Sequence, residues 1–261
     1  MQAFSKYQGS GNDFILIDDR KNLFPIDSKY ISHLCTPKWG IGADGLILLQ
    51  TSQKSDFRMR IFNSDGKEAE SCGNGLLCLN RFITDLGLPK KLYTIELMQG
   101  EAKLEMVGDR PSVFLGDPKD IRLSLNLTTT TGHFVNTGVP HAVVFTPEVK
   151  KIDINLLAKP LRWHSQFGPK GANVNFAEVK DHAVIVRTFE RGVEGETLAC
   201  GTGAAAVAVV SHQVYGLKSP ISLHFPGGEV KVAFKKDFAD LQLIGSASFV
   251  FSGVILNKTC N

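Results

Sequence analysis

The sequence contains no apolar run of about 18 residues, the length that a helix needs to cross a membrane. Its opening, MQAFSKYQGSGND, also lacks the apolar core of a secretory signal. The net charge of +3 on 261 residues is small, and the basic residues are scattered along the chain. We therefore expect a cytoplasmic protein that binds neither a membrane nor a nucleic acid.

Patterns that hold disulfides, metals or nucleotides are also missing. The five cysteines are an odd number and form no CxxC pair, so no secreted disulfide framework is indicated. The histidines show neither HxH nor HExxH spacing. Gly40–Gly45 formally fits the dinucleotide pattern GxGxxG, but it follows Pro37-Lys38-Trp39 and leads into a strand, not a helix. The sequence therefore predicts no metal and no cofactor.

What the sequence does contain is a series of short apolar strands with few helices between them. Ser28 is placed to cap a first helix, and a second helix follows Cys72 and ends near Gly87. A third helix, at 154–158, should end before Pro160, and a fourth, at 204–210, is apolar on every side and should be buried. Strands are expected at 14–17, 46–49, 57–61, 93–97, 102–106, 113–115, 142–145, 183–189, 221–225, 230–234, 241–244 and 249–256.

The same features recur in the two halves of the chain. RIFN at 60–63 leads into CGNG at 72–75, and RTFE at 187–190 leads into CGTG at 200–203, so the two cysteines lie 128 residues apart. Gly11 and Gly138 precede matching strands at nearly the same offset. We infer an α+β fold of two pseudo-symmetric halves, each with a central α-helix that begins at a cysteine.

A cysteine directly before Gly-x-Gly, at the start of a helix, can do acid–base chemistry. The first N–H groups of a helix are unpaired, so they can bind a carboxylate and lower the pKa of the thiol. Two such helix starts facing one cleft would set a thiolate and a thiol on opposite faces of one carbon. The thiolate would remove a proton and the thiol would return one, which inverts the stereocentre.

Other interpretations of the thiols stay open. One cysteine before Gly-x-Gly is most simply a buried, inert thiol, and the second, matched copy is what favours catalysis. Cys72 and Cys200 could instead form a redox-switch disulfide, because low-pKa thiols that lie close together oxidise readily. Cys35 is expected in the core, and Cys78 and Cys260 are interpreted as structural or incidental.

With their flanking motifs, these residues resemble the diaminopimelate epimerases over nearly the whole chain. The motifs are GSGNDF at 9–14, GIGADG at 40–45, RIFNSDG at 60–66, CGNG at 72–75, GVPH at 138–141, NVNF at 173–176, ERG at 190–192 and ETLACGTG at 196–203. The resemblance implies two halves, 1–117 and 118–247, each a barrel-like mixed β-sheet wrapped around its central α-helix, with the last strand, about 248–261, returning to the first half. It also implies a cofactor-independent isomerase of lysine and peptidoglycan precursor synthesis, which converts L,L- to meso-diaminopimelate as a homodimer.

The resemblance also assigns roles to single residues. Cys72 and Cys200 would be the two catalytic acid–base groups, and His141 and Glu190 would tune the pKa values of the thiols. Glu190 also suits a substrate ammonium, and Arg191 a distal carboxylate. The N–H groups that bind the reacting-end carboxylate would be those of Gly73, Asn74, Gly201 and Thr202, and the remaining substrate-binding residues would be Asn12, Asn63, Asn173, Glu190 and Arg191.

Three positions depart from well-known members of that family. Gly45 stands where they carry Gln, and Val139 stands where they often carry Asn, so we expect a looser distal pocket. Phe251 replaces the usual Tyr near the C-terminus, which bears on the homodimer. A related two-cysteine racemase, acting on a shorter amino diacid or similar to proline racemase, therefore stays open as an alternative. Phenazine-type isomerases share the fold but lack the cysteine pair.

Overall fold

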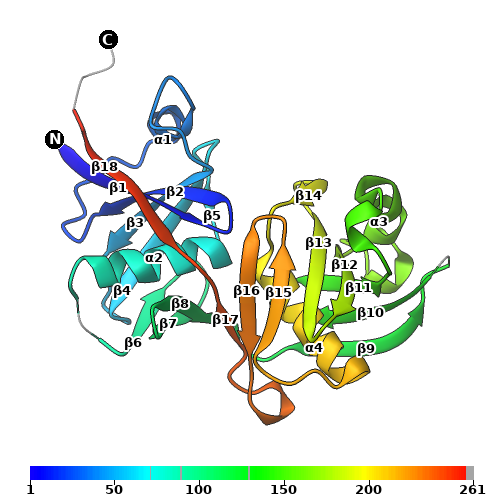
Figure 1. The fold of residues 1–261 in the computed structure, drawn as a ribbon. Coiled ribbons are helices and arrows are strands. Elements are labelled where there is room, and N and C mark those ends of the chain that lie inside the picture. Colours follow the sequence, from blue (N-terminus) through cyan, green and yellow to red (C-terminus); the bar gives the residue numbers. More distant parts are fainter. Residues whose placement is uncertain (71, 89, 129, 257–261) are drawn as a thin grey trace. The chain divides into compact units, whose positions relative to one another are not determined.

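A computed structural model describes residues 1–70, 72–88, 90–128 and 130–256 of the chain (Figure 1). The chain divides into two compact units, which we call unit 1 (residues 1–113 and the segment from Gly245 onward) and unit 2 (Phe114–Ile244). Both units combine many strands with few helices, which confirms the α+β class. Within the described ranges, no helix has the length and apolar character that crossing a membrane requires.

Unit 1 is a mixed sheet with two helices. Its helices are α1 (Ser28–Cys35) and α2 (Gly73–Asp85). Its strands are β1 (Gln2–Gly9), β2 (Asn12–Asp18), β3 (Gly45–Gln50), β4 (Phe57–Asn63), β5 (Glu68–Ala69), β6 (Leu92–Glu96), β7 (Glu101–Val107), β8 (Arg110–Phe114) and β18 (Ser248–Ile255). β18, in red, lies beside β1 and pairs with it antiparallel (Figure 1). The remainder of the expected last strand, 257–261, lies outside the described residues, as does Cys260.

Unit 2 has the same kind of organisation. Its helices are α3 (Ile154–Arg162) and α4 (Gly201–Tyr215), with short 3-10 turns at Val149–Lys151, Ser165–Phe167 and Lys236–Phe238. Its strands are β9 (Lys119–Asn126), β10 (Thr131–Asn136), β11 (Pro140–Phe145), β12 (Asn173–Lys180), β13 (Ala183–Glu190), β14 (Gly195–Thr197), β15 (Ile221–Phe225), β16 (Gly228–Ala233) and β17 (Gln242–Ile244).

The two units repeat one order of strand pairings. In unit 1, β1–β2 is antiparallel, β2–β3 parallel, β3–β4 antiparallel, β4–β6 parallel and β6–β7 antiparallel. In unit 2, the pairs β10–β11, β11–β12, β12–β13, β13–β15 and β15–β16 follow the same order. The repeat in the sequence therefore has a counterpart in the topology of each sheet.

Each unit carries a central helix with strands packed around it. α2 contacts β1, β2, β3, β7 and β18, and α4 contacts β10, β11, β12, β13, β15, β16 and β17. Every residue from Gly203 to Ser211 of α4 is buried, which confirms the expectation from its all-round apolar sequence. α4 ends at Gly216, whose φ of +68° is a conformation that glycine adopts without strain.

Two helix boundaries differ from the expectations. The cap of α1 is Asp27, whose side chain accepts a hydrogen bond from the Tyr30 N–H at 2.7 Å, and Ser28 is the first helical residue. α3 continues through Pro160 to Arg162. Pro160 lacks the N–H that would complete a helical hydrogen bond, and the helix ends two residues later. The sequence patterns also do not predict strands β1, β9, β10 and β12.

Candidate active site

In unit 1, the chain turns from β5 into α2 at Cys72. The backbone of Cys72 is extended (φ −150°, ψ 120°), and its sulfur accepts a hydrogen bond from the Gly75 N–H at 3.4 Å. The side chain is half-buried. A sulfur that caps a helix N-terminus lies where the helix dipole favours negative charge.

Asn12, the first residue of β2, faces this sulfur with its carbonyl oxygen. Its Nδ2 donates to Asp44 Oδ2 at 2.6 Å, and its Oδ1 lies 3.8 Å from Cys72 Sγ. Because an ionised carboxylate only accepts hydrogen bonds, Asp44 fixes the orientation of the amide. Asp44 is held in turn by reciprocal bonds with Asp13, at 3.1 and 2.9 Å. An amide oxygen beside a sulfur stabilises the protonated thiol, so Asn12 and the helix N-terminus have opposite effects on the Cys72 thiol.

The other residues expected in the unit 1 part of the site lie at the ends of neighbouring elements. Asn63 ends β4 and is exposed, and Gly73 and Asn74 form the first turn of α2, where helix N–H groups have no acceptor within the helix. The next residue, Gly75, is closely packed: a Cβ at this position would lie 3.1 Å from the terminal methyl groups of Ile47 and Ile61, which favours glycine.

In unit 2, the chain turns from β14 into α4 at Cys200. Its backbone is again extended (φ −129°, ψ 113°). Unlike Cys72, its sulfur accepts no capping hydrogen bond from an N–H group in the first turn of α4. The sulfur lies 3.6 Å from the hydroxyl oxygen of Thr202, and only 8% of Cys200 is exposed. A Cβ at Gly203 would lie 2.6 Å from Asn175 Oδ1 and 3.1 Å from Cys200 Cβ, so any larger residue at this position would have to displace its neighbours.

His141, on β11, lies beneath the Cys200 turn and is fully buried. Its Nε2 is 3.0 Å from the Thr202 hydroxyl oxygen, and its Nδ1 is 3.1 Å from Asn175 Nδ2. Burial, reinforced by the positive charge of Arg191, lowers the pKa of His141 to about 3. The imidazole is therefore neutral at physiological pH.

Glu190, the last residue of β13, is hydrogen-bonded to Cys200 and to Thr197, whose hydroxyl donates to Oε1 at 2.6 Å. Burial raises the pKa of Glu190, and these two hydrogen bonds oppose the rise. Next in the chain, the Arg191 N–H donates to Asn173 Oδ1 at 2.7 Å, which joins the end of β13 to the start of β12. Gly201 and Thr202 form the first turn of α4.

Each unit thus gathers its own set of the expected residues. Asn12, Asn63, Cys72, Gly73 and Asn74 belong to unit 1, and His141, Asn173, Glu190, Arg191, Cys200, Gly201 and Thr202 belong to unit 2. Sequence reasoning missed Asp44, Asn175 and the side chain of Thr202. Asn173 and Asn175 lie two apart on a strand, a spacing that places both side chains on one face and could have identified Asn175.

The features that the sequence set aside have structural explanations. Cys35 and Cys78 are buried, and burial raises the pKa of Cys35 to about 11. In the GxGxxG stretch, a Cβ at Gly40 would lie 2.1 Å from the His33 carbonyl oxygen, so that glycine allows the loop to pack against α1. In the described parts of the chain, no group of three or more His, Cys, Asp or Glu side chains could hold a metal ion.

A family model named diaminopimelate epimerase matches the chain twice, at residues 4–121 and 133–250. The diaminopimelate epimerase of Aquifex aeolicus is 40% identical over 269 residues, which covers 96% of this chain and 96% of the relative. That of Archaeoglobus fulgidus is 37% identical over 272 residues, which covers 97% of this chain and 96% of the relative.

The fold is also similar to that of a solved structure with a different name. A phenazine biosynthesis protein of the PhzF family from Bacillus anthracis superposes with a TM-score of 0.73, covering 98% of this chain and 99% of that one. At 15% sequence identity, this likeness concerns the fold alone.

Proposed function

The chain belongs to the diaminopimelate epimerase family and is an isomerase, and on that premise we propose that it converts L,L-diaminopimelate to meso-diaminopimelate with Cys72 and Cys200 as the acid–base pair. One observation carries the proposal: each unit sets a cysteine at the N-terminus of its central helix. Such a position suits both a thiol of lowered pKa and a carboxylate ligand.

The proposed reaction exchanges one proton for another. The Cys200 thiolate takes the proton from the α-carbon, and the electron pair of the broken C–H bond spreads into the substrate carboxylate. The Cys72 thiol then gives its proton to the opposite face of the carbon. The N–H groups of Gly73, Asn74, Gly201 and Thr202 would stabilise the charge on the carboxylate. One proton leaves and one arrives, so the balance needs no cofactor, and the two sulfurs exchange roles in the reverse direction.

Glu190 and His141 would set the protonation state of Cys200. Glu190 is hydrogen-bonded to the thiol and burial raises its pKa, so its carboxylate is suited to exchange a proton with Cys200. His141 contributes as a neutral, hydrogen-bonding imidazole. For the distal part of the substrate, Arg191 suits the carboxylate through its planar guanidinium, and Glu190 suits the ammonium. Asn12, Asn63 and Asn173 would supply further polar contacts.

A second candidate substrate is a shorter amino diacid such as glutamate. At Gly45, a Cβ would lie 2.6 Å from the Phe62 carbonyl oxygen, so the position has no room for a polar side chain that could read the distal end. Val139, half-buried before His141, is apolar. Neither position can therefore use a side-chain hydrogen bond to distinguish diaminopimelate from a shorter amino diacid, and such hydrogen bonds are a strong source of specificity between similar ligands.

The test is turnover in deuterium oxide under reducing conditions, with L,L-diaminopimelate, meso-diaminopimelate and glutamate. The proposal expects one solvent deuterium at the α-carbon of each inverted product. Deuterium entry with glutamate would identify the looser racemase. Absence of exchange and inversion with every substrate would refute an epimerase and leave the thiol redox switch.

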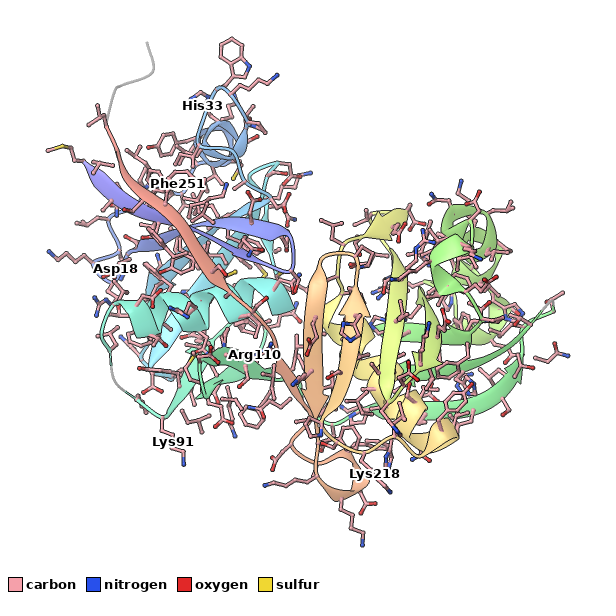
Figure 2. The ribbon with its side chains drawn as sticks, in the orientation of Figure 1. Asp18, His33, Lys91, Arg110, Lys218 and Phe251 are labelled. Carbon is pink, nitrogen blue, oxygen red and sulfur yellow. The ribbon has the colours of Figure 1, made fainter. Side chains whose placement is uncertain are left out.

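We also propose that the protein is a cytoplasmic homodimer joined through unit 1. Support comes from β18, whose apolar side chains are unusually exposed for a strand; they are Phe249, Val250, Phe251 and Val254. Figure 2 shows Phe251 on this strand. Light scattering after size exclusion should give a dimer for the natural chain and a monomer for F251R. The matched variant L123R, on exposed β9 of unit 2, should remain dimeric. The cytoplasm would keep Cys72 and Cys200 reduced.

A further inference from the structure

We propose that Asn175 is a positioning residue that fixes His141 in its Nε2–H tautomer and thereby directs the hydroxyl hydrogen of Thr202 to the sulfur of Cys200. All four residues belong to unit 2. The catalytic meaning of this arrangement rests on the proposed function, whereas the arrangement itself can be measured on the protein without substrate.

The first step is the orientation of the Asn175 side chain, which is fully buried. Its Nδ2 donates to the Ala142 carbonyl oxygen at 2.9 Å, and its Oδ1 accepts from the Thr188 hydroxyl at 2.9 Å. A backbone carbonyl can only accept, so the contact with Ala142 determines which end of the amide is nitrogen. Rotation of the amide would set its oxygen against that carbonyl, away from water.

The second step is the tautomer of His141. The same Nδ2 lies 3.1 Å from His141 Nδ1. An amide nitrogen donates and does not accept, so Nδ1 must be the unprotonated ring nitrogen. The imidazole is neutral, because burial and the charge of Arg191 hold its pKa far below the usual value. A neutral ring whose Nδ1 accepts carries its single proton on Nε2.

The third step is the hydroxyl of Thr202. His141 Nε2 lies 3.0 Å from Thr202 Oγ1, so the ring N–H donates to the hydroxyl oxygen. The one hydrogen of the hydroxyl is then available to Cys200 Sγ, which lies 3.6 Å from Oγ1. A second contact of Nε2, with Asn173 Nδ2 at 3.5 Å, is at the limit of a hydrogen bond and competes weakly. Donation therefore runs in one direction, from Asn175 to the sulfur.

The consequence is a neutral donor aimed at a thiolate. A hydrogen bond to the charged form of a group favours that form, so the Thr202 hydroxyl lowers the pKa of Cys200. It acts together with the α4 N-terminus and against the Glu190 carboxylate, which is hydrogen-bonded to Cys200. An imidazolium at His141 could not accept the hydrogen bond from Asn175 Nδ2, because both of its ring nitrogens are donors.

Nitrogen-15 NMR of the histidine-labelled protein without substrate tests the tautomer directly. The shifts and couplings of the two ring nitrogens distinguish Nε2–H from Nδ1–H. We expect His141 as the neutral Nε2–H form across neutral pH. Observation of the Nδ1–H tautomer, or of an imidazolium at pH 7, would overturn the proposal.

The thiol side is tested by iodoacetamide alkylation against pH, with mass spectrometry of the peptide that contains Cys200. T202V keeps the shape of the side chain but removes the hydroxyl, and should raise the pKa of Cys200 by about one pH unit. T202S should keep the profile of the natural chain. The matched control is T137V, because the Thr137 hydroxyl donates to the Thr202 carbonyl at 2.8 Å and not to the sulfur. An unchanged profile in T202V, or an equal shift in T137V, contradicts the proposal.

The variant N175D tests the link between Asn175 and the sulfur. An acceptor facing Nδ1 draws the ring proton to that nitrogen, leaves Nε2 as an acceptor, and turns the Thr202 hydroxyl away from Cys200. N175D should therefore shift the Cys200 profile as T202V does, and the double variant should shift no further. Additive shifts would show that Asn175 acts independently of Thr202. A protein with the expected tautomer and profile that fails to invert any amino acid would refute the proposed function alone.

Discussion

The turns at Cys72 and Cys200 have similar backbone conformations, but different side chains pack beneath them. In unit 1, the cross-strand pair beneath the turn is Ile47 with Ile61, both buried. The pair at the equivalent place in unit 2 is Asn175 with Thr188, both fully buried and hydrogen-bonded to one another. The glycine three residues after each cysteine reports the same contrast, because Gly75 faces methyl groups and Gly203 faces an amide oxygen.

This contrast shows how a duplicated fold can give two like groups different chemistry. The sulfur of Cys72 accepts a hydrogen bond from the Gly75 N–H of its own helix and faces the amide oxygen of Asn12. The sulfur of Cys200 lies beside the Thr202 hydroxyl, and Cys200 is hydrogen-bonded to Glu190. Strand order and helix position are common to both units, so the difference comes from side chains beneath and beside each turn. The predictions below break or sharpen this comparison, beginning with the largest effect.

Removing either sulfur should abolish inversion, although their surroundings differ. General acid–base catalysis contributes about 10²–10⁴-fold, so C72A and C200A should each lower inversion by about 10³-fold or more. Thermal unfolding should change little in either variant. C78A is the matched control on α2: Cys78 is fully buried, and its loss should cost about 1 kcal/mol of stability while inversion continues. Substantial inversion by C72A or C200A would contradict the paired mechanism.

The two equivalent glycines should respond unequally to alanine. In G203A, the added methyl would lie 2.6 Å from Asn175 Oδ1, and the polar network beneath Cys200 would have to move. Displacements of this size can cost about 10²-fold in turnover. In G75A, the added methyl would meet flexible side-chain ends at 3.1–3.3 Å, so turnover should fall less than about tenfold. Equal losses in steady-state turnover would show that the buried amide is unimportant.

Asp44 should control Cys72 through Asn12. In D44A, the Asn12 amide loses the acceptor that holds it, and its Nδ2 can turn to the sulfur. A donor in place of an acceptor favours the thiolate, so the pKa of Cys72 should fall by about one pH unit. Peptide-resolved alkylation measures this shift, whose sign is opposite to that expected at Cys200 in T202V. The control D18A changes a carboxylate at the other end of β2 (Figure 2) and should leave Cys72 unaffected.

His141 should make the protein sensitive to acid. Its pKa in the folded protein lies below its ordinary value of 6.5, so the unfolded chain binds more protons between pH 6.5 and about pH 3. Stability should therefore fall as the pH drops below 6.5, by up to about 1.4 kcal/mol per pH unit. Urea unfolding at several pH values should show a shallower acid slope for H141Q. H33Q, on the exposed side of α1, should keep the slope of the natural chain.

Much of the fold could be predicted because short sequence patterns indicate the helices and most of the strands. The apolar run after Cys200 indicates a buried helix, and the repeated Cys-Gly-x-Gly indicates two equivalent helix starts, as the structure has them. β9 was missed although Ile121, Leu123 and Leu125 alternate with polar residues as in a strand, and most of its side chains are exposed or only half-buried in the structure. The sequence pattern places the α1 cap one residue late because Asp27 and Ser28 are both good capping residues, and only the hydrogen bond to Asp27 decides between them.

The candidate site was less visible in the sequence than the fold. Cys72 and Cys200 stand out by their repeat, but the residues beneath Cys200 do not. Asn175 lies in the buried part of β12, and its partners Ala142, Thr188 and His141 come from other strands and become neighbours only through sheet register. A tautomer depends on such contacts, so no spacing along the chain encodes it.

The pairing of β1 with β18 has a consequence for synthesis on the ribosome. Unit 2 is one continuous segment and can fold as soon as residue 244 has emerged. The sheet of unit 1 keeps the β1 edge that β18 covers unpaired until residues 248–255 follow. Although its first strand is made earliest, unit 1 is therefore the later of the two to be completed, and a nascent chain halted at residue 244 exposes that edge to neighbouring chains.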